Sequence, residues 1–193
     1  MAMIEWSRWI AAAALLLASP AVAQDKGAPL TDPENTVYMD ILHSGRVLIE
    51  LRPELAPKTV ARFKELVRKG FYDGLTFHRV IPAFMAQGGD PKGDGQGGSG
   101  VNIPPEFSKE PHVRGTVSMA RKADDPNSAD CQFFIVIRES NDLDGKYTIF
   151  GRVVQGMDFV DRLKKGSKAL DGKVLNPDKI KEMRVVADAA KPK

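Results

Sequence analysis

Apolar and polar residues alternate strictly over two neighbouring stretches near residue 40. The apolar positions of the first stretch are Val37, Met39 and Ile41, and those of the second are Val47, Ile49 and Leu51. Ser44-Gly45 lies between them and favours a tight turn. An alternation of period two buries one face of each stretch, so the pattern predicts a β-hairpin over residues 36–51.

The hydrophobic period changes from residue 57 onward. Val60, Phe63, Leu66 and Val67 recur at helical spacing. Basic residues follow at 68–69 and Gly70 can end the helix, so an amphipathic helix is predicted from Pro57. The same reasoning predicts a second helix over residues 157–165, stopped by Gly166, with Phe159, Val160 and Leu163 on its apolar face.

Short apolar runs bounded by Gly, Pro, Asn or Asp fill the rest of the chain. They cover residues 76–81, 115–120, 132–137, 147–154 and 183–187. Many short strands interrupted by two helices are typical of an antiparallel barrel or sandwich whose ends the helices cover. Neither a repeat nor an internal linker is visible, so a single domain is expected.

The N-terminus resembles a secretory signal peptide. An apolar run over residues 10–18 follows Arg8 and precedes a Ser-Pro break and Ala21-Val22-Ala23, a small-x-small cleavage pattern. The run is too short to span a bilayer. We therefore expect residues 1–23 to be removed after Ala23, residues 24–35 to form a flexible leader, and the product to be periplasmic or secreted. The alternative is a buried helix or an uncleaved anchor.

Composition narrows the function classes. One Cys among 193 residues excludes a disulfide framework or a Cys-rich zinc module within the chain. Twenty-eight basic residues against 25 acidic ones, with no block of like charge, give no sign of a nucleic-acid or membrane surface. Both tryptophans, Trp6 and Trp9, lie in the expected signal peptide, so protein from its native compartment should lack tryptophan fluorescence.

Several local motifs resemble known ligand-binding or catalytic motifs but lack features that those sites need. The Gly93–Gly98 segment matches G-x-G-x-x-G but has neither the strand before it nor the helix after it that a dinucleotide site needs. The Asp142–Gly145 segment lacks the last acidic ligand of a calcium loop. The three histidines, His43, His78 and His112, are isolated, so no metal site is expected. Cys131 is a candidate nucleophile, although a buried thiol is the preferred interpretation.

One string stands out, Phe77-His-Arg-Val-Ile-Pro-Ala-Phe-Met-Ala-Gln-Gly-Gly-Asp90. Downstream follow Ser118-Met-Ala-Arg121, Gln132-Phe-Phe-Ile135 and Leu143-Asp-Gly-Lys-Tyr147-Thr-Ile-Phe-Gly151, in the same order and at suitable distances. Together these segments resemble the cyclophilin-type peptidyl-prolyl cis-trans isomerases. The resemblance covers about residues 36–188, which leaves 189–193 as a C-terminal tail, and it points to a bacterial, exported member.

The resemblance implies a mainly β fold, a closed eight-stranded antiparallel barrel capped by two α-helices, with the active site on its outer surface. It implies that Arg79 is the catalytic arginine and that Gln87 orients it and binds substrate. Phe84, Met85, Phe134 and Leu143 would form the walls of the proline pocket. Gly95, Ala120, Arg121 and Gln132 would line the site for the residue before proline, and Tyr147 would add an aromatic wall.

Three positions depart from the family pattern. Asp142 stands where many members have the tryptophan that anchors cyclosporin, so weak sensitivity is expected. Tyr147 replaces a common histidine, so turnover should not change near pH 6.5. Arg121 replaces a common asparagine, and its charge could favour acidic residues before proline.

The function implied is the isomerisation of X-Pro bonds in unfolded or folding proteins, by a monomer without cofactor or metal. Its partners would be proline-containing segments of client proteins, with no nucleic acid and no stable membrane insertion after signal cleavage. Two alternatives stay open at this point: a binding module or chaperone with little turnover, and a hydrolase using Cys131.

Overall fold

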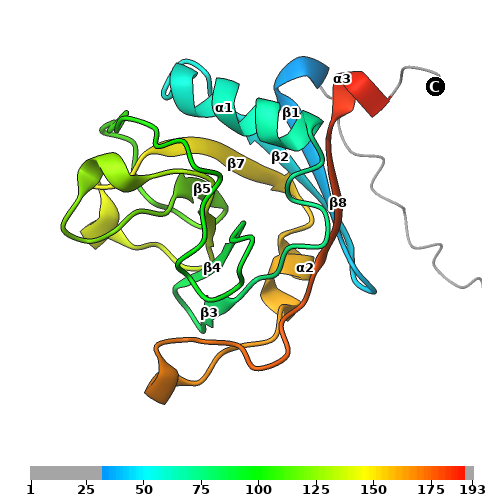
Figure 1. Ribbon diagram of the computed structural model, residues 1–193, viewed down its shortest axis with the longest axis vertical. Helices are drawn as coiled ribbons and strands as arrows, with labels where there is room; N and C mark the ends of the chain where they lie inside the picture. The colour runs from blue at the N-terminus through cyan, green and yellow to red at the C-terminus, as the bar shows by residue number, and fades with distance from the viewer. Residues whose placement is uncertain (1–31, 190–193) are drawn as a thin grey trace, which may run out of the picture.

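Eight antiparallel strands form one curled sheet in the computed structural model, which describes residues 32–189 (Figure 1). The strand order is β3-β4-β6-β5-β7-β2-β1-β8. The strands are β1 (Thr36–Ile41), β2 (Gly45–Leu51), β3 (Arg79–Ile81), β4 (Met85–Gly88), β5 (Thr116–Met119), β6 (Phe133–Val136), β7 (Ile149–Gln155) and β8 (Ile180–Val185). The helices are α1 (Pro57–Arg68), α2 (Met157–Arg162) and the short α3 (Val186–Ala189), with 3-10 turns at Pro33–Asn35, Pro126–Ser128, Asn141–Leu143 and Lys168–Leu170.

The two edge strands, β3 and β8, are not paired with each other by a ladder within residues 32–189. The segment before β3 is nevertheless linked to the start of β8. The Phe77 amide donates to the Asp178 carbonyl at 3.0 Å, and the Ile180 amide donates to the Leu75 carbonyl at 2.8 Å. The sheet is therefore a curled half-barrel, and full closure stays a prediction.

The predicted hairpin and first helix are confirmed. Strand β1 pairs with β2 from Thr36↔Glu50 to Ile41↔Gly45. Helix α1 starts with Pro57 at its first turn, and its buried face contains Val60, Phe63, Leu66 and Val67. The Phe63 ring packs 4.8 Å from that of Phe150 and 5.9 Å from that of Phe133, centroid to centroid. These contacts join α1 to the core inside the sheet.

Two features of helix ends differ from the sequence predictions. Helix α2 ends at Arg162, before the predicted residue 165, because Leu163 is extended (ψ 138°) and buries its side chain in the core. Gly166 therefore does not end this helix. Residues 183–187 were expected to be a strand, but β8 stops at Val185 and α3 follows, which is a second difference. The Gly166 prediction is thus wrong because α2 has already ended at Arg162.

Strand β4 was missed by sequence analysis, because none of the short apolar runs covers residues 85–88. A turn at residues 82–84 precedes it, where Ala83 has φ 57°. Met85–Gly88 pairs with β3 on one side and β6 on the other. Four residues between two partners form a strand because both neighbours satisfy their backbone groups, which is information that a local pattern does not contain.

The last residues assigned to the leader belong to the folded body. Pro33–Asn35 form a 3-10 turn capped by the Asp32 carboxylate. Glu34 pairs with Lys64 and Arg68 of α1, at 3.0 and 2.8 Å. The signal peptide, its cleavage site, both tryptophans and residues 190–193 lie outside the described residues. Within residues 32–189, none of the helices has the length and hydrophobicity that a membrane span requires.

Candidate active site

The wall made by β3, β4, β6 and β5 has two different faces. Val80, Ala86 and Ile135 point into the main core. The alternating residues form a separate apolar cluster on the other face: Met85, Phe134 and Val136, with Ile81, Phe84, Ala120, Leu143 and Tyr147 packed against them. Since side chains of a strand alternate between faces, this second cluster lies on the outside of the curled sheet.

The strand register brings the predicted catalytic residues into one row. Arg79 is directly opposite Gln87 across β3 and β4, and Gln87 is directly opposite Phe134 across β4 and β6. Met85 lies two residues before Gln87 on the same face, opposite Val136. A polar pair and an apolar floor are thus placed side by side by the sheet itself.

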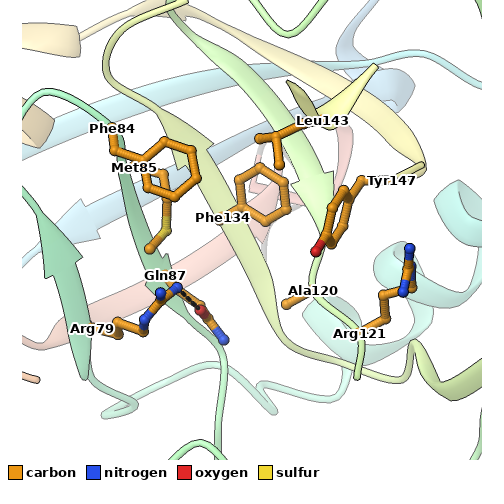
Figure 2. Close-up of a pocket in the computed structure, with 9 residues that line it drawn as sticks. All are labelled: Arg79, Phe84, Met85, Gln87, Ala120, Arg121, Phe134, Leu143 and Tyr147. Atoms are coloured by element: carbon orange, nitrogen blue, oxygen red, sulfur yellow. Dashed lines mark hydrogen bonds between the residues drawn. The ribbon is translucent and has the colours of Figure 1, made fainter. Parts of the chain in front are cut away.

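A cavity of about 170 Å³ opens on this row (Figure 2). Its lining consists of Arg79, Phe84, Met85, Gln87, Ala120, Arg121, Phe134, Leu143 and Tyr147. Met85 and Phe134 are buried, and the Phe134 ring meets the Tyr147 ring edge-on at 5.5 Å. Figure 2 shows the apolar side chains along one side of the cavity and the Arg79–Gln87 pair on the other.

A second cavity, of about 250 Å³, adjoins the first through Gln87, Ala120 and Arg121. It holds the two remaining predicted site residues, Gly95 and Gln132. All eleven residues proposed from the sequence therefore lie in these two adjoining cavities.

The Arg79 guanidinium is held on three of its nitrogens. Nη1 donates to Oε1 of Gln87 at 3.2 Å. Nε donates to the main-chain oxygen of Asp171 at 2.9 Å, and Nη2 donates to the Asp171 carboxylate at 3.0 Å. A guanidinium has five N–H donors, so two are left for a bound molecule.

A chain of amides fixes the orientation of Gln87. Nε2 of Gln132 donates to the carbonyls of Gly95 and Gly97, at 3.1 and 2.9 Å. The Gln132 oxygen is therefore its remaining group, and it accepts from Nε2 of Gln87 at 3.0 Å. This leaves the Gln87 oxygen facing Arg79, the one arrangement in which each contact pairs a donor with an acceptor.

Arg121 is engaged by the backbone around it. Its Nε donates to the Lys146 carbonyl at 3.0 Å, and its Nη1 donates to the Lys122 and Ala123 carbonyls at 2.7 and 2.9 Å. The guanidinium carbon lies 4.7 Å from the centroid of the Tyr147 ring. Arg121 thus braces this side of the cavity, which leaves fewer donors for an acidic substrate residue than the sequence suggested.

A buried histidine, to which sequence analysis assigned no role in the site, supports the back of the cavity. His112 is fully buried and stacks on Phe134, with ring centroids 6.1 Å apart. Its Nδ1 lies 2.8 Å from the Asp144 carboxylate and its Nε2 lies 3.0 Å from the Ser118 hydroxyl. Burial lowers the pKa of His112, so the neutral ring donates to Asp144 and accepts from Ser118.

The rejected motifs have structural explanations. The Asp90 carboxylate accepts hydrogen bonds from the amides of Lys92, Asp94 and Gly95, which are groups that a phosphate would need in the glycine-rich loop. Cys131 is fully buried, and burial raises the pKa of its thiol to about 12. In the part of the chain that the structure describes, no three His, Cys, Asp or Glu residues are grouped to hold a metal ion.

Two further residues at the site were missed by sequence analysis, Asp171 and Asp144. Asp171 precedes Gly172 in a segment that looked like an ordinary loop, 92 positions from Arg79. Asp144 lies in the rejected calcium-like motif. The only local signal was an Asp-Gly pair in each case. Such a pair predicts a turn, but it does not predict which side chain the aspartate will bind.

Comparison with known proteins identifies the family of this chain. The family described as "Cyclophilin type peptidyl-prolyl cis-trans isomerase/CLD" matches residues 36–185. The chain is 52% identical over 191 residues to a probable peptidyl-prolyl cis-trans isomerase of Brucella suis, covering 93% of this chain and 95% of that protein. It is 42% identical over 152 residues to peptidyl-prolyl cis-trans isomerase B of Bacillus subtilis, covering 78% and 97%.

Solved structures give the same result. A cyclophilin from Hirschia baltica superposes with a TM-score of 0.72 at 32% identity, covering 81% of this chain and 76% of that one. A Cryptosporidium parvum cyclophilin-type isomerase, crystallised in the presence of the dipeptide Ala-Pro, superposes with a TM-score of 0.71 at 30% identity, covering 78% and 98%. With this fold, this site and these relatives, the chain belongs to the cyclophilin-type peptidyl-prolyl cis-trans isomerases.

Proposed function

We propose that this isomerase acts through Arg79, which binds the twisted state of an X-Pro bond in the first cavity. Rotation about such a bond is slow because amide resonance gives a barrier of ~18–20 kcal/mol. Twisting removes the resonance and leaves a lone pair on the pyramidal proline nitrogen. That nitrogen accepts a hydrogen bond far better than the planar nitrogen does, so a donor placed there stabilises the transition state selectively.

The observation that supports this role is the position of the Arg79 guanidinium. It lines the same cavity as the apolar side chains of Phe84, Met85 and Phe134. The apolar wall would hold the proline ring while the preceding carbonyl rotates. A dry wall also strengthens the interaction of the guanidinium with the nitrogen. A preference of ~3–4 kcal/mol for the twisted state would supply about two to three decades of rate.

Gln87 would have two tasks in this mechanism. Its oxygen would orient Arg79, and because its side chain lines both cavities it would contact the backbone of a bound segment. The residue before proline would lie toward the second cavity, along Ala120, Arg121, Gln132 and Gly95. Leu143 and Tyr147 would close the opposite side of the proline pocket.

The substrates we propose are exposed proline-containing segments of unfolded or folding proteins outside the cytoplasm. The support for export is the N-terminal pattern at residues 1–23. Mass determination on protein from the native envelope should find a chain that starts at Gln24. The same protein should behave as a monomer in solution, and its fluorescence spectrum should contain no tryptophan emission. A chain that retains Trp6 and Trp9 would contradict cleavage.

We also propose that the barrel closes between residues 74–77 and 178–180. The hydrogen bonds of the Phe77 and Ile180 amides across this seam support closure. Hydrogen exchange should then protect both amides as strongly as amides of β1 and β2. Rapid exchange at the seam alone would favour an open half-barrel.

A binding module with little turnover is the second candidate, since the same pocket could simply hold proline. It is less well supported because holding a proline ring requires no guanidinium fixed on three nitrogens beside the pocket. A protease-coupled assay with proline peptides separates the two. Measurable binding without acceleration would favour the module.

The test of the mechanism is Arg79→Ala in the same assay. We expect kcat/KM to fall about 100-fold, equivalent to ~3 kcal/mol, with little change in Tm because the Arg79 side chain lies at the surface of the cleft. Arg152→Ala is the matched control, since Arg152 is an exposed arginine of β7 that lines neither cavity. Full activity in Arg79→Ala would remove the role we assign to Arg79.

A further inference from the structure

The loop between α2 and β8 lies along the free edge of β3, beside Arg79. The Val80 amide donates to the Gly172 carbonyl at 2.8 Å, and the Val80 carbonyl accepts from the Gly166 amide at 2.9 Å. The Val174 amide donates to the His78 carbonyl at 2.9 Å. Figure 1 shows this loop extending away from the body beside β3. Main-chain bonds on both sides of Arg79 therefore anchor the loop without help from its side chains.

This anchoring places Asp171 at the outer edge of the Arg79 guanidinium. Asp171 has a left-handed backbone, with φ 49° and ψ 40°. In this conformation its main-chain oxygen accepts from Nε of Arg79 at 2.9 Å while its carboxylate accepts from Nη2 at 3.0 Å. Two acceptor oxygens of Asp171 thus bind the Nε and Nη2 edge of the guanidinium. On the other side, Gln87 accepts from Nη1 at 3.2 Å.

We propose that Asp171 is a positioning residue of the isomerase, whose carboxylate fixes the plane of the Arg79 guanidinium for the twisted proline nitrogen. This inference rests on the catalytic role proposed for Arg79. Asp171 itself does not line the proline cavity, so it acts through Arg79 alone. Small errors in the orientation of a donor cost rate because the transition-state contact must be aligned.

The exposure of the Arg79–Asp171 ion pair indicates that the pair orients a side chain and contributes little to the stability of the fold. The Asp171 side chain is 80% exposed and that of Arg79 is 30% exposed. Ion pairs of such exposure contribute little to stability, because water screens them. Loss of the carboxylate should therefore leave the fold and the proline pocket intact and release only Nη2 of the guanidinium, since Nε keeps its bond to the main-chain oxygen of Asp171.

Two variants test the proposal in the proline-peptide assay. Asp171→Gly removes the side chain and keeps the left-handed backbone, which glycine adopts freely. Asp171→Asn keeps an oxygen acceptor and also tolerates this backbone. We expect kcat of Asp171→Gly to fall about tenfold with KM and Tm nearly unchanged, and Asp171→Asn to retain at least about half of the wild-type kcat.

The matched control is Asp124→Gly, which removes an exposed aspartate that lines neither cavity. It should leave kcat unchanged. A wild-type kcat in Asp171→Gly, a loss that appears in KM or Tm, or equal losses in the Gly and Asn variants would each overturn the positioning role. If Arg79→Ala also retained full activity, the proposed mechanism itself would fail; if only Asp171→Gly did, the failure would be confined to Asp171.

Discussion

Gln87 donates a hydrogen bond from Nε2 to Oε1 of Gln132, 3.0 Å away, and this contact decides which end of Gln87 faces Arg79. Both protons of the Gln132 amide are used on the carbonyls of Gly95 and Gly97. The loop at residues 95–97 therefore acts on Arg79 through two side-chain amides. Such a chain is expected to be non-additive when its members are removed.

The first prediction concerns this chain of amides. Gln87→Leu keeps the size of the side chain but removes the acceptor for Arg79, so kcat/KM should fall about tenfold. Gln132→Leu should have a smaller effect, because Gln87 can still reach Arg79. The double variant should resemble Gln87→Leu alone in the proline-peptide assay. Losses that simply multiply would show that the two amides act independently.

The second prediction concerns cyclosporin. Asp142 lies in the exposed 3-10 turn Asn141–Leu143 and does not line the proline cavity. Because this residue is an aspartate, it offers the drug no aromatic ring. We expect weak inhibition of the wild-type protein. Asp142→Trp should strengthen inhibition about tenfold or more, because an added indole buries apolar area against the drug. Asp142→Leu serves as the control for loss of charge, and tight inhibition of the wild type would contradict the prediction.

The third prediction concerns the pH dependence of stability. Burial lowers the pKa of both His78 and His112 in the folded state, whereas in the unfolded chain they titrate near ~6.5. As the pH falls below that value, the unfolded state takes up protons that the folded state does not. The free energy of unfolding should then decrease, by up to ~1.4 kcal/mol per pH unit for each histidine.

Denaturant unfolding between pH 7 and 5 measures this slope before most carboxylates titrate. His112→Asn should make the slope shallower. The matched control is His43→Asn, since His43 is exposed and asparagine tolerates its φ of 60°. A stability that is flat or increases as the solution becomes more acidic would show that neither histidine stays neutral when buried.

The fourth prediction concerns Cys131. The thiol is fully buried, lies 3.3 Å from the Gly89 carbonyl, and has a pKa of about 12 because of burial. The reactive thiolate is therefore nearly absent at pH 8. Alkylating reagents should leave the native protein unmodified and fully active, and should modify it only after unfolding. Loss of isomerase activity on alkylation of the folded protein would contradict this prediction and support a catalytic role for the Cys131 thiol.

Most of the fold follows from local sequence patterns. Period-two alternation located β1 and β2 because one face of each strand is buried, and period 3.6 located α1 for the same reason. The same patterns failed at β4 and at the end of α2. Strand β4 exists through pairing on both sides, and α2 ends early because Leu163 turns into the core. Both outcomes depend on partners that are distant in the chain.

The sequence by itself determined the family of this protein, through the string from Phe77 to Asp90 and the segments that follow it, and it predicted eleven of the residues that line the two cavities. It did not contain the contacts that align those side chains. Asp171 meets Arg79 only because the loop before β8 hydrogen-bonds to the edge of β3. His112 meets Asp144 and Ser118 only because three separate segments pack behind Phe134. Residue types are a local property of the chain, whereas the orientation of a guanidinium depends on acceptors that folding brings from elsewhere.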